Sequence, residues 1–115
     1  MRVAVVVCVH WMDAETIRDE LVNLPIGATV MIGDGQGSEA VVKKIAEEEL
    51  KLDVEIWPLD TEKYDDRADS YRTNEMLKTS PDLCIAFVTD ESKIVNDFVR
   101  KSRGSHIETV VVKQQ

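Results

Sequence analysis

The chain has 115 residues, the length of one domain of ordinary size, and 43% of them are apolar, which is enough for one core. Its net charge of −8 comes from 22 acidic and 14 basic residues, so duplex nucleic acid and anionic membranes are poor candidate partners. No segment approaches the roughly 20 consecutive apolar residues of a membrane span. A single small anion held by local dipoles stays compatible with this charge. We expect one domain over residues 1–115.

Apolar runs and turn residues predict strands that alternate with helices along the whole chain. In chain order, the predicted strands are 2–9, 28–32, 53–57, 82–88 and 107–112, and the predicted helices are 13–22, 38–50, 67–78 and 94–101. The β-branched run 2–9 is typical of a central strand buried on both faces, whereas the alternation in 53–57 is typical of a strand nearer an edge. Alternating strands and helices with short connections predict an α/β fold with a parallel sheet covered on both faces.

Capping residues and apolar spacing support the predicted helices. Asp13 is suited to cap the first helix, and Asp65 or Asp66 is suited to cap the third. In the second and fourth helices we expect these apolar residues to face the sheet: Val41, Val42, Ile45, Ala46, Ile94, Val95, Phe98 and Val99. The acidic segment 58–66 is the longest predicted irregular stretch, and residues 103–106 are predicted to form a turn. The acidic residues from Asp60 to Asp69 form either a solvated loop or a lid over a ligand.

The two cysteines are predicted to lie at opposite ends of neighbouring strands. Cys8 comes near the carboxyl end of the first strand and Cys84 near the amino end of the fourth. At about 3.3 Å per residue they are too far apart to form a disulfide. We therefore expect two buried thiols, which suits a reducing cytoplasm.

Three loops are expected to lie together at the carboxyl ends of the strands, where open parallel sheets bind ligands. They are residues 8–13, 33–39 and 89–93. The second contains Gly33, Gly35 and Gly37, and glycine allows a ligand to approach the backbone closely. The turn matches neither the dinucleotide fingerprint nor the Walker loop. It is either a phosphate cradle at the start of a helix or a tight turn with Ser38 as a helix cap.

Four motifs in register resemble one protein family. The segment LPIGATVMIGDGQGSE (24–39) looks like the "LP-GA-V-hydrophobic-GG-A-x-GAD" stretch of the SLOG superfamily, in its YspA/YpsA-like branch. Trp11-Met-Asp13 is similar to the Trp-x-Asp after strand one, RTNEM (72–76) resembles "RNxxM", and PDLCIAF (81–87) resembles "PDLVIAF". The superfamily includes the LOG phosphoribohydrolases and the DNA-processing protein DprA.

The resemblance implies a three-layer Rossmann-like fold with a five-stranded, mainly parallel sheet and about four helices. It also implies that the protein binds a nucleotide or nucleotide derivative and forms a homodimer or higher homo-oligomer. Many members are sensors without known catalysis. We therefore expect a cytoplasmic binding module for a phosphate-bearing, nucleotide-like ligand.

The sequence departs from the family pattern at two loops. Val7-Cys8-Val9 stands where the family has Gly-Ser-Arg, and residues 88–93 replace its Pro-Gly-Gly-x-Gly-Thr loop. In that second loop Asp90 and Glu91 would repel an anion, although Ser92 or Lys93 can compensate. The catalytic glutamate of the LOG enzymes corresponds to Asn96, so the resemblance places no carboxylate there. An N-glycosidase would need Glu75 or Glu91 in its place.

Individual side chains in these loops have two interpretations each. Arg72 offers a bidentate fork for phosphate or carboxylate, or forms a surface ion pair with Asp69 or Glu75. Trp11 either stacks on a base or shields the end of the sheet, and Glu39 either caps a helical turn or binds a ribose hydroxyl. His10 can act as an acid or base near neutral pH.

The preferred function is a non-catalytic binding module, with two alternatives: a nucleotide N-glycosidase, and an interaction protein that has lost its site. No catalytic residue, metal site or cofactor is predicted. The predicted ligand-binding residues are His10, Trp11, Gly33, Gly35, Gln36, Gly37, Ser38, Glu39, Arg72, Glu75, Thr89, Ser92 and Lys93.

Overall fold

Five parallel strands form a sheet in the order β3-β2-β1-β4-β5. The computed structural model describes residues 1–64, 67–89 and 93–114. The strands are β1 (Arg2–Val7), β2 (Thr29–Gly33), β3 (Asp53–Trp57), β4 (Leu83–Val88) and β5 (Glu108–Lys113). This confirms the predicted α/β class and the edge position of the 53–57 strand.

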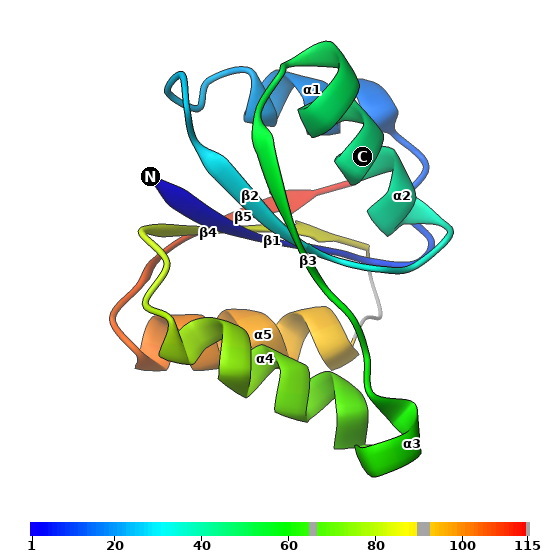
Figure 1. Ribbon diagram of the computed structural model, residues 1–115, viewed down its shortest axis with the longest axis vertical. Coiled ribbons are helices and arrows are strands. Elements are labelled where there is room, and N and C mark those ends of the chain that lie inside the picture. Colours follow the sequence, from blue (N-terminus) through cyan, green and yellow to red (C-terminus); the bar gives the residue numbers. More distant parts are fainter. Residues whose placement is uncertain (65–66, 90–92, 115) are drawn as a thin grey trace.

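Helices cover both faces of this sheet and give a three-layer, Rossmann-like arrangement. The helices are α1 (Ala14–Leu21), α2 (Ser38–Lys44), α3 (Thr61–Tyr64), α4 (Ala68–Lys78) and α5 (Lys93–Gly104), and α2 continues into the π-helical turn η1 (Ile45–Glu49). Figure 1 shows α1 and α2 on one face and α4 and α5 on the other. As expected, the carboxylate of Asp13 caps α1, where Oδ1 accepts the Thr16 amide at 3.1 Å.

The alternating side chains of the central strand β1 supply two separate cores. Val3, Val5 and Val7 are buried in the core beneath α1 and α2. Ala4 and Val6 are buried on the opposite face, in the core beneath α4 and α5. A strand with both faces buried has no polar alternation, which is why the sequence of β1 is a continuous β-branched run.

The order in which the chain adds strands to the sheet reverses between β1 and β4. From β1 the chain builds outward through β2 to β3, and it then crosses back to pair β4 with the free side of β1. The connections that leave the carboxyl ends of β1 and β4 therefore diverge to opposite faces of the sheet. Open parallel sheets have a crevice at such a point.

Several predicted boundaries are wrong for local physical reasons. Residues 58–66 are not wholly irregular, because Asp60 caps the short helix α3 by accepting the Lys63 amide at 3.1 Å. The last helix runs to Gly104 rather than 101, so the turn before β5 is shorter than residues 103–106. The first strand ends at Val7 because the Trp11 amide bonds to the Cys8 carbonyl at 3.0 Å and closes a turn. The proposed caps Asp65 and Asp66 lie outside the described residues.

Most of the residues predicted to face the sheet are buried, with exceptions. Val42, Ile45, Ala46, Val95 and Phe98 are buried as expected. Val41 is 39% exposed and Ile94 is 46% exposed, since both lie on the outer side of their helices. No helix in the described ranges combines the length and the apolar character needed to cross a bilayer.

The two cysteines are buried and form no disulfide. Cys84 lies opposite Ala4 in the register of β1 and β4, four residues away from Cys8 along the strand. This separation agrees with the prediction. Burial also raises the pKa of the Cys84 thiol, so this group stays protonated near neutral pH.

Candidate functional site

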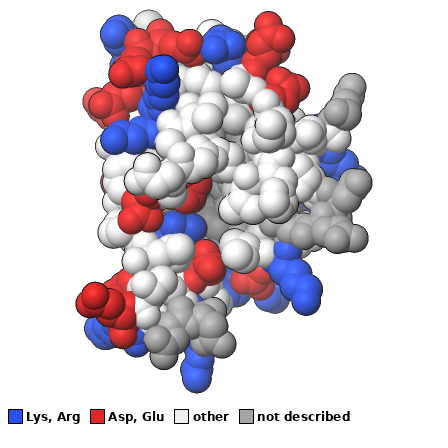
Figure 2. Space-filling view, turned by 90° about the vertical axis from the view of Figure 1, so that its right-hand side faces the viewer, with Lys and Arg blue, Asp and Glu red and all other residues white. Residues whose placement is uncertain are grey.

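A cavity of about 800 Å³ opens at the carboxyl ends of the strands. Figure 2 views this end of the sheet and shows basic and acidic side chains beside a hollow near its centre. The wall combines the end of β1 and the residues that follow it, the start of α5, two residues of α4 and single residues of α2 and of the segment after β3. The lining residues are Val6, Val7, Cys8, Val9, His10, Glu39, Leu59, Asp69, Arg72, Lys93, Ile94, Val95 and Asn96.

Arg72 projects from α4 into this cavity, and its side chain is only 12% exposed. Its Nη1 donates to the carbonyl oxygen of Trp57 at 3.3 Å, which anchors the guanidinium at the end of β3. Nη2 lies 3.6 Å from Glu39 Oε2 and 3.7 Å from Asp69 Oδ1. Both separations exceed the ordinary hydrogen-bond length. The two carboxylates therefore balance the positive charge of Arg72 without engaging all of its N–H donors.

Both interpretations of Arg72 are therefore partly represented. The ion pair with Asp69 forms, but it lies in the cavity wall rather than on an open surface. Glu75 instead pairs with Lys78, where Oε1 and Nζ are 3.1 Å apart. Among the residues that the structure describes, Glu75 is not part of this cavity wall and instead lines a smaller cavity beside it.

The glycine turn is filled by a side chain of the protein itself. Glu39 Oε1 accepts the amide of Gly35 at 3.0 Å. A Cβ at Gly33 would stand 2.1 Å from Glu39 Oε2 and 2.5 Å from Arg72 Nη1. Glycine at position 33 thus lets the carboxylate and the guanidinium approach the backbone. The expectation that the Gly35 amide faces a ligand is corrected, because that amide already donates to Glu39.

Glu39 lies in the first turn of α2, where its charge faces the positive end of the helix dipole as predicted. Its hydrogen bond goes to an amide of the preceding turn rather than to an amide of its own helix. Its second oxygen faces Arg72 in the cavity, where a ligand hydroxyl can also reach it. The ribose-binding alternative stays open on this geometry.

Ser38 is a structural residue rather than a cap or a ligand contact. The N-cap of α2 is Gly37, and Ser38 is buried in the first turn. Its Oγ donates to the Cys8 carbonyl at 2.9 Å and ties the second loop to the first. Gln36 and Gly37 are exposed and lie outside the cavity wall of the described chain.

Trp11 shields the end of the sheet, in agreement with the second of its two interpretations. The side chain is 5% exposed, packs edge-to-face on Phe87 at 5.3 Å between ring centroids, and donates from Nε1 to the Asp13 carbonyl at 2.7 Å. Its ring faces are therefore not available to stack on a base. Its inclusion as a ligand contact is wrong because the chain turns inward after Cys8.

The remaining predicted residues are His10, Thr89, Ser92 and Lys93. His10 and Lys93 are exposed and line the cavity together with Glu39 and Arg72. Thr89 lies beside them but pairs with Cys8, with Oγ1 and Sγ 2.8 Å apart. Ser92 and the neighbouring Glu91 lie outside the described residues.

Several cavity residues were not among the predicted contacts, and two of them, Leu59 and Asp69, lie far from the three predicted loops in sequence. Leu59 lies just before the acidic segment 60–69 and Asp69 is its last residue, and β3, which precedes both, ends at the same edge as β2. Asp69 precedes Arg72 by three residues, a spacing that places two side chains together on a helix. That spacing was the signal available in the sequence.

The site contains two cations, Arg72 and Lys93, and two carboxylates, Glu39 and Asp69, against an apolar wall. Such a mixture suits a ligand that carries both an anionic group and hydroxyl donors. The sequence matches no family model, no curated protein and no solved structure. The function must therefore be argued from the chemistry of this cavity.

Proposed function

We propose that the cavity binds a small nucleotide or nucleotide derivative and that the protein works as a non-catalytic binding module. The observation that carries this proposal is Arg72, a largely buried guanidinium in an open cavity at the point where strand order reverses. A phosphate would receive N–H donors from Arg72, with Lys93 across the cavity as a second cation.

The carboxylates give the proposed ligand a second point of recognition. Glu39 and Asp69 lie on either side of the guanidinium and can accept hydrogen bonds from sugar hydroxyls. The side chains of Val9, Leu59 and Ile94 offer apolar contact for the rest of the ligand. Both carboxylates would repel a bare polyanion, which favours a ligand with few phosphates.

The resemblance to the SLOG superfamily supports the same proposal from the sequence. Arg72, from the segment that resembles "RNxxM", lines the same cavity as Asn96. An amide at position 96 binds hydrogen-bonding groups but is no general acid or base at neutral pH. Membership of that superfamily, the homo-oligomeric state and a cytoplasmic location remain parts of the proposal.

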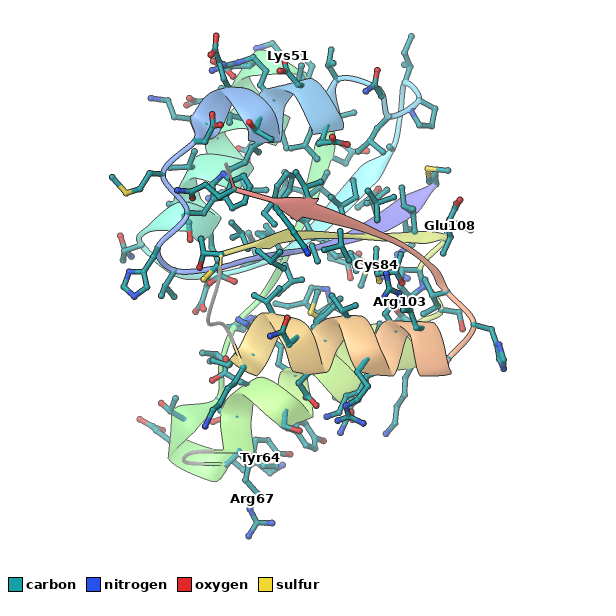
Figure 3. The ribbon with its side chains drawn as sticks, turned by 180° about the vertical axis from the view of Figure 1, so that it is seen from behind. Lys51, Tyr64, Arg67, Cys84, Arg103 and Glu108 are labelled. Atoms are coloured by element: carbon teal, nitrogen blue, oxygen red, sulfur yellow. The ribbon has the colours of Figure 1, made fainter. Side chains whose placement is uncertain are left out.

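Calorimetric titration of the purified protein with AMP and with ribose 5-phosphate tests the proposal. We expect Arg72→Ala to weaken binding of both by about tenfold or more, because a charged hydrogen bond in a shielded site is lost. Arg103→Ala is the matched control, since Arg103 is exposed at the far end of α5 (Figure 3). Equal affinities for the two variants, or heat signals absent from all three proteins, would refute it.

An N-glycosidase is the second candidate, and one observation favours it. Glu39 and Asp69 place two carboxylates beside Arg72, although neither occupies the position that the resemblance assigns to a catalytic glutamate. Incubation of nucleoside monophosphates with concentrated protein, followed by chromatography for free base, distinguishes the candidates. Base release that disappears in Glu39→Gln would favour the enzyme.

The third candidate, an interaction protein without a ligand site, is supported only at the glycine turn. Glu39 fills the space above Gly33 and Gly35, as that interpretation requires. The adjoining cavity of about 800 Å³ stays open, within the usual size of ligand pockets. The balance of these observations favours ligand binding.

A further inference from the structure

Half of the aromatic residues of the chain gather around a second, smaller cavity. The sequence has only six aromatic residues, and Trp11, Phe87 and Phe98 are buried in the two cores. The other three, Trp57, Tyr64 and Tyr71, line a cavity of about 220 Å³ at the end of β3. Their position is unusual because the cores are built mainly from aliphatic side chains, and these aromatic rings are left partly accessible.

The rings in this cavity already form a stacking surface. Tyr64 and Tyr71 stack with ring centroids 3.8 Å apart and planes inclined by 18°. Tyr71 is 42% exposed, and Figure 3 shows Tyr64 at the outer end of the helical layer formed by α3 and α4. The Trp57 indole is held by its Nε1, which donates to Glu55 Oε1 at 2.9 Å. A pre-ordered aromatic wall lowers the entropic cost of binding a flat ring.

Two carboxylates face the small cavity. Asp60 and Glu75 contribute them to its wall, in which Arg72 is the described cation. Each is already engaged, Asp60 with the Lys63 amide and Glu75 with Lys78, but a carboxylate has several acceptor positions. These acceptors favour a ring that carries N–H donors.

Arg72 joins this cavity to the larger one. Its side chain lines both cavities, and its Nη1 donates to the carbonyl of Trp57, whose ring belongs to the aromatic wall. Because both cavities share this side chain, they lie next to each other.

We propose that the small cavity is a ring subsite, which takes a flat heteroaromatic ring with an exocyclic amino group, such as adenine, while the phosphate stays at Arg72 in the large cavity. The proposal rests on the proposed function and specifies the ligand class of the same site. Stacking on Tyr71 and Trp57 would hold the ring, and Asp60 or Glu75 would accept its amino hydrogens. A base with a carbonyl oxygen in place of the amino group would face these carboxylates unfavourably.

Titrations with AMP, IMP and ribose 5-phosphate test the ring subsite. We expect Tyr71→Ala to weaken AMP binding about tenfold, in line with the loss of one stacked base, and to leave ribose 5-phosphate binding unchanged. Tyr71→Phe keeps the ring and should retain most of the AMP affinity. Wild-type protein should bind AMP more tightly than IMP. Circular dichroism of each variant verifies that the fold is retained.

The outcomes separate the subsite from the proposed function. Binding of ribose 5-phosphate as tight as that of AMP, or equal AMP affinity in wild type and Tyr71→Ala, overturns the ring subsite and leaves the phosphate site standing. Equal binding of IMP and AMP overturns the role of the carboxylates in selecting an amino group. No binding of any of the three ligands to wild-type protein overturns both proposals.

Discussion

Glu39 is the residue on which the electrostatics of the large cavity depend. Its carboxylate accepts the Gly35 amide, faces the guanidinium of Arg72 and occupies the space that glycine at position 33 leaves open. An anion that approached Arg72 would meet this charge at close range. Glu39 is thus an internal anion beside the guanidinium to which we propose that a phosphate binds, and a bound phosphate would compete with Glu39 for this cation.

Removal of that charge gives a prediction at the scale of a single residue. Glu39→Gln keeps an oxygen for the Gly35 amide and frees Arg72 from its competitor. We therefore expect this variant to bind inorganic phosphate several-fold more tightly than wild type, measured by calorimetry at fixed ionic strength. Glu20→Gln is the control, because Glu20 lies on α1 and is not part of the cavity wall among the described residues.

The opposite result would identify a different role for Glu39. If the carboxylate binds sugar hydroxyls, Glu39→Gln should weaken ribose 5-phosphate binding and leave inorganic phosphate unaffected. Unchanged affinity for both ligands would remove Glu39 from the site.

At the scale of elements, the first and second loops are joined by one buried hydrogen bond. Ser38 Oγ donates to the Cys8 carbonyl, and Cys8 in turn contacts Thr89 after β4. Three loops that leave neighbouring strands are thereby held together behind the cavity. This hydrogen bond is a better explanation than helix capping for the serine that follows the glycine turn.

Loss of the Ser38 hydroxyl should therefore cost stability. Ser38→Ala removes this donor from the Cys8 carbonyl, which keeps the Trp11 amide, so we expect the free energy of unfolding to fall by about 1 kcal/mol, the net contribution of one hydrogen bond. Urea denaturation followed by circular dichroism measures the change. Ser105→Ala, at an exposed position after α5, should change it by less than about 0.5 kcal/mol. Equal stability of the two variants would contradict the structural role of Ser38.

Patterns at the scale of elements also explain how much of the fold and of the site could be predicted from the sequence. The β-branched run of β1 and the apolar run of β4 predict central parallel strands, because burial on both faces demands such residues. Helix α3 was not predicted, since four polar and aromatic residues carry no helical periodicity and the signal lies in one Asp60 cap. The site residues that followed from topology, such as His10 and Lys93, line the cavity, and so does Arg72, which followed from the family resemblance.

Contacts that depend on side-chain direction could not be predicted from the sequence. Trp11 follows β1 as closely as His10 does, yet one packs on Phe87 and the other reaches the cavity. The aromatic wall of the small cavity was missed for a similar reason. Tyr64 and Tyr71 belong to separate helices, and only the packing of α3 against α4 brings their rings together.

At the scale of the whole molecule, strand order decides where a ligand can bind. The reversal between β1 and β4 opens the crevice, and α4 and α5 supply Arg72 and Lys93 at its wall. The overall charge of −8 opposes long polyanions, whereas a mononucleotide needs only the local cations. Fold and charge together favour a small ligand at the carboxyl ends of the strands.

The most direct test of this account is the backbone amide NMR spectrum of the ¹⁵N-labelled protein, recorded during titration with AMP. We expect the largest shift changes at His10, Glu39, Arg72 and Asn96, with smaller changes at Tyr71 and none around the exposed end of α1. Saturable changes confined to those positions would agree with a nucleotide site at the crevice. An unchanged spectrum at millimolar AMP, or changes centred on another surface, would contradict it.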